Sequence, residues 1–320
     1  MKIVFLDGHT LQTPDHALQK LESYGSLVVY DRTASSQIVE RSKDADILIV
    51  NKTPLTSEVL LQLPQLKLIC IAATGYDKVD IGYARKRNIP VCNCANYSTR
   101  AVAQMALSLL LEATDHVGFY TEKNLQGQWS KSHDFCYSLR QRYDLEGKRL
   151  AIVGFGNIGR AFAQTMNALG VMVYAVTSKA ASALPSYVNA INIDDAFATC
   201  DIVSLNCPLT LDNKAFVNSE LLKRTKKGLI LVNTARGGLI NENDVADALK
   251  DGTLGAYCTD VLGQEPPKAD CPLFDAPNVY ITPHIGWRTP QTVERIINIL
   301  AQNIESFLAG QPQSVVNIRE

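Results

Sequence analysis

Three glycines with the spacing Gly-x-Gly-x-x-Gly carry the clearest chemical signal in this sequence. Gly154, Gly156 and Gly159 follow the apolar residues 150–153, and a helical pattern then continues to Met166. In a strand–turn–helix setting, the first glycine permits a tight turn, the second lets a pyrophosphate approach the backbone, and the third lets helix and strand pack closely. The helix amino terminus adds unpaired amides and a positive dipole end. The spacing alone is weak evidence, but with this context it predicts a nucleotide-binding site.

The strand expected next, residues 171–176, ends in Thr177, Ser178 and Lys179. An acidic residue about 20 positions after the glycine motif usually bonds the adenosine ribose and repels a 2′-phosphate. No carboxylate stands at that place here, so the sequence leaves the choice between NAD and NADP open. Lys179 could attract a 2′-phosphate, or it could point into solvent while another residue holds the ribose.

Three further segments carry polar side chains at expected strand ends or loops. They read Asn-Thr-Ala-Arg-Gly-Gly at 233–238, Asp-Val-Leu-Gly-Gln-Glu-Pro at 260–266 and Thr-Pro-His-Ile-Gly-Trp at 282–287. Each alone has an ordinary explanation: the arginine as a solvated or paired charge, Glu-Pro-Pro as a rigid turn, and the histidine as a structural residue. Their meaning changes when they are taken in order together with the glycine motif.

That order resembles the D-2-hydroxyacid dehydrogenase family along essentially the whole chain. Loops of this family also look similar to residues 74–80, 96–98 and 207–210. Within the family, the chain looks most like the glycerate dehydrogenases, also called hydroxypyruvate reductases, through residues 30–33 and 284–287. The resemblance implies hydride transfer between a nicotinamide cofactor and a small 2-oxo or D-2-hydroxy acid, with hydroxypyruvate and glyoxylate as the expected substrates and D-glycerate and glycolate as their products.

The resemblance carries the catalytic roles to Arg236, Glu265 and His284, and physical chemistry explains why each side chain suits its role. A 2-oxo acid presents a carboxylate beside a ketone, and the planar donor fork of arginine can clamp that pair. Hydride transfer leaves negative charge on the ketone oxygen, so a histidine that titrates near neutrality can serve as general acid in reduction and as base in oxidation. Glu265 would pair with the imidazole, orient it and favour its protonated form.

The remaining site residues also follow from the resemblance. Thr74, Gly75 and Tyr76 are expected to bind substrate together with Arg236 and His284, the backbone amides around Gly75 and Tyr76 donating to the substrate carboxylate. The residues expected to line the cofactor cleft are Thr74, Gly154, Gly156, Asn157, Ile158, Gly159, Thr177, Cys207, Thr234, Ala235, Arg236, Asp260 and His284. Asp260 is expected near the nicotinamide carboxamide. The resemblance further implies domain closure and a homodimer formed through the nucleotide domain.

Two other classes of protein are alternatives. Some transcriptional co-repressors share this scaffold, so a nucleotide-sensing binding protein is the second hypothesis, although the chain has no basic patch. A short-chain reductase would activate a tyrosine with a lysine four positions on, and no Tyr-x-x-x-Lys spacing occurs in the sequence. The third hypothesis is therefore weak.

The elements that must position these residues alternate in type along the chain. Expected strands are residues 3–6, 27–30, 47–50, 68–71, 149–153, 171–176, 201–205, 229–233 and 257–261, and helical patterns include 17–24, 59–63, 79–87, 101–114 and 290–308. Such alternation is typical of parallel sheets covered on both faces. We expect an α/β fold with two Rossmann-like, doubly wound domains, one flavodoxin-like and one dinucleotide-binding. The substrate domain should be discontinuous, with residues 1–98 and 286–320 around a dinucleotide-binding domain of residues 99–285.

Composition limits the partners. With 31 basic and 32 acidic residues the formal net charge is -1, so no long-range field would gather nucleic acid or an anionic membrane. The apolar run at the amino terminus stops at Asp7, too early for a signal peptide, and the expected location is cytoplasmic. Eight cysteines show no repeated Cys-x-x-Cys pair. We expect no metal, with zinc or a disulfide at Cys92 and Cys94 as the less favoured alternative.

Overall fold

The computed structural model describes residues 1–11 and 15–317. The chain falls into two compact units: unit 1 contains Met1–Ser98 and the chain from Arg288 onward, and unit 2 contains Thr99–Trp287. The chain therefore leaves unit 1 after Ser98 and returns to it at Arg288. Among the described residues, no helix is both long enough and apolar enough to cross a membrane.

Unit 1 has a five-stranded parallel sheet among its described residues, in the order β2-β1-β3-β4-β5. Its elements are β1 (Lys2–Phe5), α1 (Asp15–Glu22), β2 (Ser26–Val29), α2 (Ile38–Ser42), β3 (Ile47–Val50), α3 (Ser57–Leu61), β4 (Leu68–Ile71), α4 (Ile81–Lys86), β5 (Val91–Asn93) and α11 (Pro290–Leu308). This is the flavodoxin-like strand order, in which β2 is added on one side of β1 and the strands from β3 onward are added on its other side.

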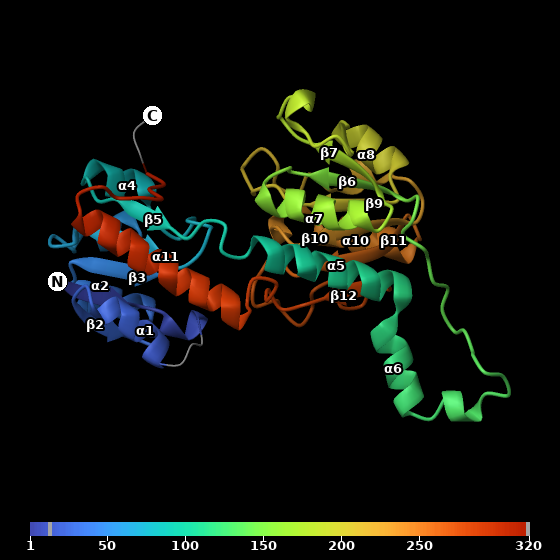
Figure 1. The fold of residues 1–320 in the computed structure, drawn as a ribbon, viewed down its shortest axis with the longest axis horizontal. Coiled ribbons are helices and arrows are strands. Elements are labelled where there is room, and N and C mark those ends of the chain that lie inside the picture. Colours follow the sequence, from blue (N-terminus) through green and yellow to red (C-terminus); the bar gives the residue numbers. More distant parts are fainter. Residues whose placement is uncertain (12–14, 318–320) are drawn as a thin grey trace. The chain divides into compact units, whose positions relative to one another are not determined.

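The C-terminal helix α11 closes one face of this sheet and contacts β4 and α1 (Figure 1). Its buried side chains recur every three or four residues, among them Val293, Ile296, Ile297 and Leu300. Thr289 caps the helix by accepting a hydrogen bond from the amide of Thr292, 3.1 Å away. The amphipathic pattern thus returns the end of the chain to the sheet that its beginning formed.

A carboxylate fills the crevice between β1 and β3, where the order of the strands in unit 1 reverses. Asp7 follows β1 and is buried; its Oδ2 accepts the amides of Lys52 (2.6 Å) and Thr53 (2.7 Å) after β3, and its Oδ1 accepts the amide of Asn51 at 2.9 Å. In open α/β sheets, ligands usually occupy this crevice. Here it is taken up by the protein's own side chain, which fixes the loop after β3.

Unit 2 is built on a seven-stranded parallel sheet within the described part of the chain, in the order β12-β11-β10-β9-β6-β7-β8. Its elements are α5 (Thr99–Asp115), α6 (Val117–Leu125), β6 (Arg149–Val153), α7 (Asn157–Ala168), β7 (Met172–Val176), β8 (Val188–Ala190), α8 (Ile193–Thr199), β9 (Ile202–Leu205), α9 (Ser219–Leu222), β10 (Leu229–Asn233), α10 (Glu242–Lys250), β11 (Leu254–Thr259) and β12 (Val279–Ile281). This is the dinucleotide-binding order, in which β7 and β8 are added on one side of β6 and the strands from β9 onward are added on its other side. The order of the strands therefore reverses between β6 and β9. Short 3₁₀ turns across the two units are η1 (Gly8–Thr10), η2 (Ser35–Gln37), η3 (Trp129–Lys131), η4 (Ala181–Ala183) and η5 (Gly237–Leu239).

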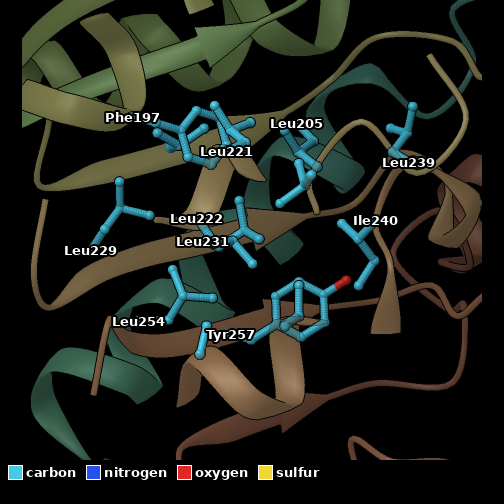
Figure 2. Packing of buried hydrophobic residues seen from close by; sticks show 14 of the residues in the cluster. Phe197, Leu205, Leu221, Leu222, Leu229, Leu231, Leu239, Ile240, Leu254 and Tyr257 are labelled. Atoms are coloured by element: carbon cyan, nitrogen blue, oxygen red, sulfur yellow. The ribbon is translucent and has the colours of Figure 1, made fainter. Parts of the chain in front are cut away.

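Two hydrophobic cores lie on opposite faces of this sheet. Along β6, Leu150 and Ile152 pack into the core under α5 and α7, whereas Ala151 and Val153 pack into the core under α8 and α10. Figure 2 shows the second core, with Tyr257 buried among the aliphatic side chains. The alternation follows from the two-residue period of a strand, and the α/β fold expected from the sequence is confirmed.

Residues 116–148 form an arm that leaves the sheet of unit 2 (Figure 1). His116, with a left-handed φ of 55°, separates α5 from α6. No residue of α6 or η3 is buried. The exposed large apolar side chains of this arm are Val117, Leu125, Trp129, Phe135, Leu139 and Tyr143.

The last strand expected in unit 2 begins and ends earlier than its apolar pattern indicated. Residues 257–261 were expected, and β11 spans Leu254–Thr259. The Oγ1 of Thr259 accepts the amide of Val261 at 3.1 Å and contacts its carbonyl oxygen at 2.6 Å. This side chain folds the backbone into a turn at the point where the strand would have continued.

Candidate active site

The glycine loop lies at the point of strand reversal in unit 2, between the carboxyl ends of β6 and β9. Gly154 has a φ of +93°, and a Cβ there would lie 2.6 Å from the amide nitrogen of Cys207. A Cβ at Gly159 would lie 2.5 Å from the carbonyl oxygen of Gly154, so these two glycines are required by packing. A Cβ at Gly156 would meet nothing within 4 Å. The open side of Gly156, at the amino terminus of α7, therefore leaves room for a phosphate group.

A cavity of about 900 Å³ opens beside this loop. It is lined by Val153, Gly154, Phe155, Gly156, Val176, Thr177, Ser178, Lys179, Ala190, Ile191, Asn192, Ile193, Cys207, Asn213 and Phe216. No carboxylate is among these lining residues. The volume and mixed apolar and polar lining suit an adenosine moiety better than a bare phosphate.

Lys179 and Cys207 are the titratable groups of this cavity. The ammonium of Lys179 donates to the carbonyl oxygen of Phe155 in the glycine loop, at 2.9 Å. Lys179 is exposed, and its ammonium contacts the glycine loop. The choice between the two alternatives for Lys179 stays a prediction. Cys207 is half-buried, and burial raises the pKa of its thiol above the usual value.

The loop after β10 carries Arg236 and is shaped by Asn233, which is fully buried. The Nδ2 of Asn233 donates to the carbonyl oxygen of Arg236 (3.0 Å) and to the hydroxyl of Tyr257 (3.2 Å), and its Oδ1 accepts the amide of Ala235 (3.1 Å). Nearby, the buried Oγ1 of Thr234 has no hydrogen-bond partner among the described residues. An unsatisfied buried hydroxyl at this place fits a cleft that takes a polar ligand.

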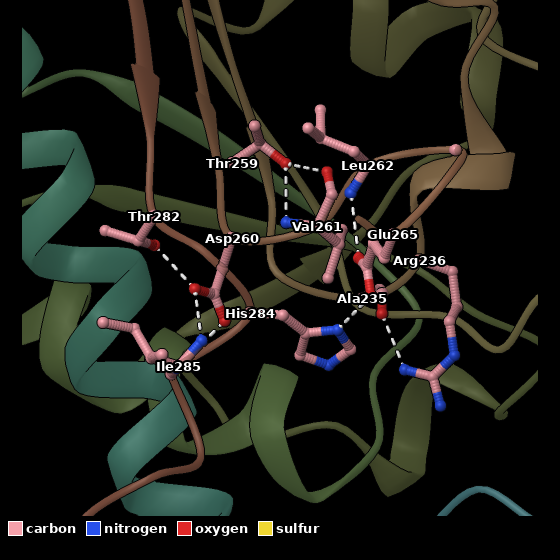
Figure 3. A network of polar contacts seen from close by, with 12 residues as sticks. Ala235, Arg236, Thr259, Asp260, Val261, Leu262, Glu265, Thr282, His284 and Ile285 are labelled. Atoms are coloured by element: carbon pink, nitrogen blue, oxygen red, sulfur yellow. Dashed lines mark hydrogen bonds and ion pairs between the residues drawn. The ribbon is translucent and has the colours of Figure 1, made fainter. Parts of the chain in front are cut away.

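The loop that carries His284 is held by Asp260, whose carboxylate is buried. It accepts hydrogen bonds from the hydroxyl of Thr282 (2.6 Å) and from the amides of Ile285 (2.9 Å) and Gly286 (2.7 Å), as Figure 3 shows in part. These bonds clamp both sides of His284, which has a left-handed φ of 55°. Such a backbone conformation is unfavourable for histidine and persists only where the surroundings enforce it. The cofactor contact expected of Asp260 stays a prediction.

His284 and Glu265 lie in contact. The Nδ1 of the imidazole is 2.6 Å from Oε2 of Glu265, and Oε1 of Glu265 accepts the amide of Leu262 at 3.0 Å (Figure 3). The two side chains are 28% and 37% exposed, so they remain within reach of a small molecule. Because Nδ1 faces a carboxylate, it carries the ring proton in the neutral imidazole, and Nε2 is the nitrogen left to exchange a proton with a ligand.

Arg236 is exposed, and its guanidinium donates to the carbonyl oxygen of Ala235 at 2.7 Å. The structure gives this residue no ion pair among the described part of the chain. Figure 3 shows this guanidinium bonded to the carbonyl oxygen of Ala235, in the same view as the imidazole of His284. Arg236, Glu265 and His284 therefore come from three loops at the carboxyl edge of one sheet.

The other expected substrate residues belong to unit 1. Thr74, Gly75 and Tyr76 follow β4, and the hydroxyl of Thr74 donates to the carbonyl oxygen of Cys94, the residue after β5, at 3.0 Å. Tyr76 is 43% exposed. Asn157 and Ile158 open α7 beside the glycine loop. The roles of all these residues in ligand binding stay predictions.

All eight cysteines are free thiols, and burial raises the pKa of Cys92 to about 11. Among residues 1–11 and 15–317, no cluster of three potential ligand side chains could hold a metal ion.

Sequence reasoning missed one residue of the candidate site, Asn233. The signal was present, because an asparagine at the end of a buried strand, three residues before the arginine, can bond the turn it begins.

Two parallel sheets, a glycine loop at the reversal point and an imidazole paired with a carboxylate define a nicotinamide-dependent oxidoreductase. Residues 107–286 match the family model described as D-isomer specific 2-hydroxyacid dehydrogenase, NAD binding domain. The chain belongs to the D-isomer specific 2-hydroxyacid dehydrogenase family. It is an enzyme that transfers hydride between a nicotinamide cofactor and a 2-oxo or 2-hydroxy acid.

Relatives of known name align over nearly the full chain. A hydroxypyruvate reductase of Blautia hydrogenotrophica is 38% identical, covering 99% of this chain and 100% of that protein. A glycerate dehydrogenase of Methylorubrum extorquens is 37% identical, covering 98% of both. Among solved structures, an acyclic imino acid reductase in complex with NADPH and D-Arg superimposes with a TM-score of 0.89 at 28% identity, covering 99% of this chain and 100% of that one.

Proposed function

We propose that this enzyme reduces hydroxypyruvate or glyoxylate to D-glycerate or glycolate, using Arg236, Glu265 and His284. The observation that carries the proposal is the 2.6 Å contact between Nδ1 of His284 and Oε2 of Glu265, at the edge of the sheet that bears the glycine loop. The names of the two relatives above support the substrate class. The reaction consumes one 2-oxo acid, one reduced nicotinamide and one proton.

Arg236 binds the substrate. Its planar guanidinium matches a carboxylate and an adjacent ketone oxygen with two parallel donors, and it polarises the carbonyl. The guanidinium is exposed and bonded to the Ala235 carbonyl oxygen, so it can turn toward an arriving anion with the loss of one hydrogen bond. Thr74 and the backbone amides around Gly75 and Tyr76 are the further donors that we propose for the substrate carboxylate.

His284 provides the proton. A bound nicotinamide supplies the hydride that reaches the carbonyl carbon, and negative charge then develops on the carbonyl oxygen. The Nε2 of His284 donates its proton to that oxygen, while Glu265 holds the ring by Nδ1. In the reverse reaction the neutral imidazole accepts the proton from the hydroxyl of the 2-hydroxy acid.

The cofactor fits the cleft beside the glycine loop. Gly154, Gly156, Asn157, Ile158 and Gly159 take the pyrophosphate at the amino terminus of α7, where Gly156 leaves open space. The remaining contacts come from Thr177, Cys207, Thr234, Ala235 and Asp260. We assign NADP as well as NAD to this cleft, since no carboxylate lines the cavity and Lys179 lies across the glycine loop.

The enzyme forms a homodimer through unit 2 in this proposal, and it works in the cytoplasm. The exposed apolar side chains of the arm, residues 116–148, support an interface, because covering apolar surface with a second subunit removes it from water. Phe135 is 90% exposed and Leu125 85%. Sedimentation should find a dimer, and the double variant Leu125→Ser, Phe135→Ser should shift it toward monomer; a monomeric parent protein would contradict this part of the proposal.

Steady-state turnover tests the proposed function. The purified protein is assayed against hydroxypyruvate, glyoxylate, pyruvate and 2-oxoglutarate with NADH and with NADPH. The proposal expects hydroxypyruvate or glyoxylate to give the highest kcat/KM. No turnover with any of the four, together with tight NADH binding, would favour a nucleotide-sensing protein instead.

A further inference from the structure

The loop that carries Glu265 is anchored from outside the proposed catalytic trio. Glu242 is the first residue of α10, and its Oε1 accepts the amide of Gly263 at 2.7 Å. A Cβ at Gly263 would lie 3.2 Å from the same oxygen and 3.4 Å from the carboxylate carbon. The carboxylate of Glu242 thus lies directly against the backbone of this loop.

Two consecutive amides of the loop are fixed by two carboxylates. The amide of Leu262 donates to Oε1 of Glu265, and the amide of Gly263 donates to Oε1 of Glu242. The other oxygen of Glu265 faces His284. Glu265 thus holds the Val261–Leu262 peptide, and Glu242 holds the next peptide, Leu262–Gly263, so the two carboxylates are linked through adjacent peptides of one loop.

We propose that Glu242 is a positioning residue, which holds the 262–266 loop so that Glu265 stays against His284. This inference rests on the proposed function, in which the pair of Glu265 and His284 provides the proton. Glu242 touches neither the imidazole nor the substrate in this account. It acts through the amide of Gly263.

A simpler role is available for Glu242, because an acidic residue in the first turn of a helix stabilises the helix through its dipole. Asp244, two residues later in α10, provides the matched control. It is also anionic and in the first turn, but its Oδ2 accepts the amide of Ser219, 2.8 Å away, at the start of α9. A helix effect would be common to both residues, whereas the effect on the Glu265 loop would belong to Glu242 alone.

The physical expectation concerns the freedom of the loop. Without the Glu242 carboxylate, the Gly263 amide turns to solvent and the loop relaxes, so Glu265 spends less time against Nδ1 of His284. The imidazole is then held less often in the orientation from which Nε2 can donate its proton, so the rate of reduction falls. A misplacement of about 1 Å can cost up to ~10²-fold in rate, and we expect roughly tenfold here because the trio itself is intact.

The experiment compares Glu242→Ala, Glu242→Gln, Asp244→Ala and the parent enzyme in the reduction of hydroxypyruvate from pH 6 to 10. Glu242→Ala should lower kcat roughly tenfold and change the pH profile of kcat/KM, with the Kd for NADH unchanged. Glu242→Gln keeps an oxygen that can accept the Gly263 amide and should restore most of the activity. Asp244→Ala should leave kcat within about twofold of the parent value and should leave the pH profile unchanged. If Glu242→Ala does not fold, Glu242→Asp, whose carboxylate is drawn back by one carbon, replaces it with the same expectation.

A double-variant test separates this inference from the proposed function. In an enzyme that already carries Glu265→Gln, Glu242→Ala should have little further effect on the pH profile, since both changes act on one pair. Effects that simply add, or a profile that Glu242→Ala leaves unmoved, would overturn the positioning role. If Glu265→Gln alone changed nothing, the failure would lie in the proposed function.

Discussion

Gly237 packs against the backbone of Leu262 so closely that a Cβ at Gly237 would lie 2.0 Å from the Leu262 carbonyl carbon. The residue after Arg236 is thus in direct contact with the loop that carries Glu265. The loops that carry Arg236 and Glu265, which are separated along the chain, pack against each other here. The loop that carries His284 contacts them through Glu265. The geometry of the proposed trio depends on this contact between backbones.

The variant Gly237→Ala tests that dependence. A methyl group at this position forces the 262–263 peptide away from the arginine loop, because no flexible side chain is available to yield. We expect kcat for 2-oxo acid reduction to fall up to about 10²-fold, with NADH binding largely kept. Gly82→Ala is the control, since a Cβ there meets Asp80 at an ordinary 3.4 Å. Parent-like turnover by Gly237→Ala would show that the contact does not position the site.

Lys179 should influence the choice of cofactor. Its ammonium can leave the Phe155 carbonyl oxygen and pair with a 2′-phosphate, an interaction with a charged group that contributes about 1.5 kcal/mol or more. Lys179→Ala should therefore lower kcat/KM for NADPH about tenfold and leave that for NADH nearly unchanged. Lys223→Ala, at the exposed end of α9, controls for the loss of one positive charge. An unchanged ratio of the two kcat/KM values would remove Lys179 from the cofactor site.

Patterns in the sequence predicted the parts of the fold that depend on local chemistry. The strands 47–50, 68–71, 149–153 and 229–233 and the helix 290–308 were expected with the bounds that the structure has. These segments are buried on both faces or strongly amphipathic, so their periods are clear. The short strands β8 and β12 and the helix α6 were not expected, because β8 and β12 have three residues each and α6 buries none.

The candidate site was accessible to sequence reasoning only in part. Arg236, Glu265 and His284 were suggested by a family resemblance, since their separation along the chain gives no periodic signal. The contribution of Glu242 could not be read in advance. It depends on which backbone amide comes within reach after the chain has folded, and a glutamate at any helix start has the same local appearance.

The thiol of Cys207 reports on the cleft independently of turnover. Burial raises its pKa, so little thiolate is present near neutrality, and alkylation by iodoacetamide should be slow at pH 7.5 and accelerate as the pH rises through 9. Exposed Cys136 should react first. Cofactor at about ten times its Kd should slow labelling of Cys207 about tenfold, in proportion to the fraction of empty sites. Mass spectrometry follows the labelling of Cys207. Equal labelling with and without cofactor would show that the nucleotide does not bind beside Cys207.

Proton donation by the imidazole that Glu265 holds is the central claim, and the pH profile of hydroxypyruvate reduction tests it most directly. Reduction takes its proton from Nε2 of His284, and the Glu265 carboxylate holds that ring by Nδ1, so the pH profile of Glu265→Gln should differ from that of the parent enzyme. His284→Ala should lose roughly 10²- to 10⁴-fold in kcat at every pH. Superimposed profiles for the parent and Glu265→Gln, or near-normal turnover by His284→Ala, would contradict the account.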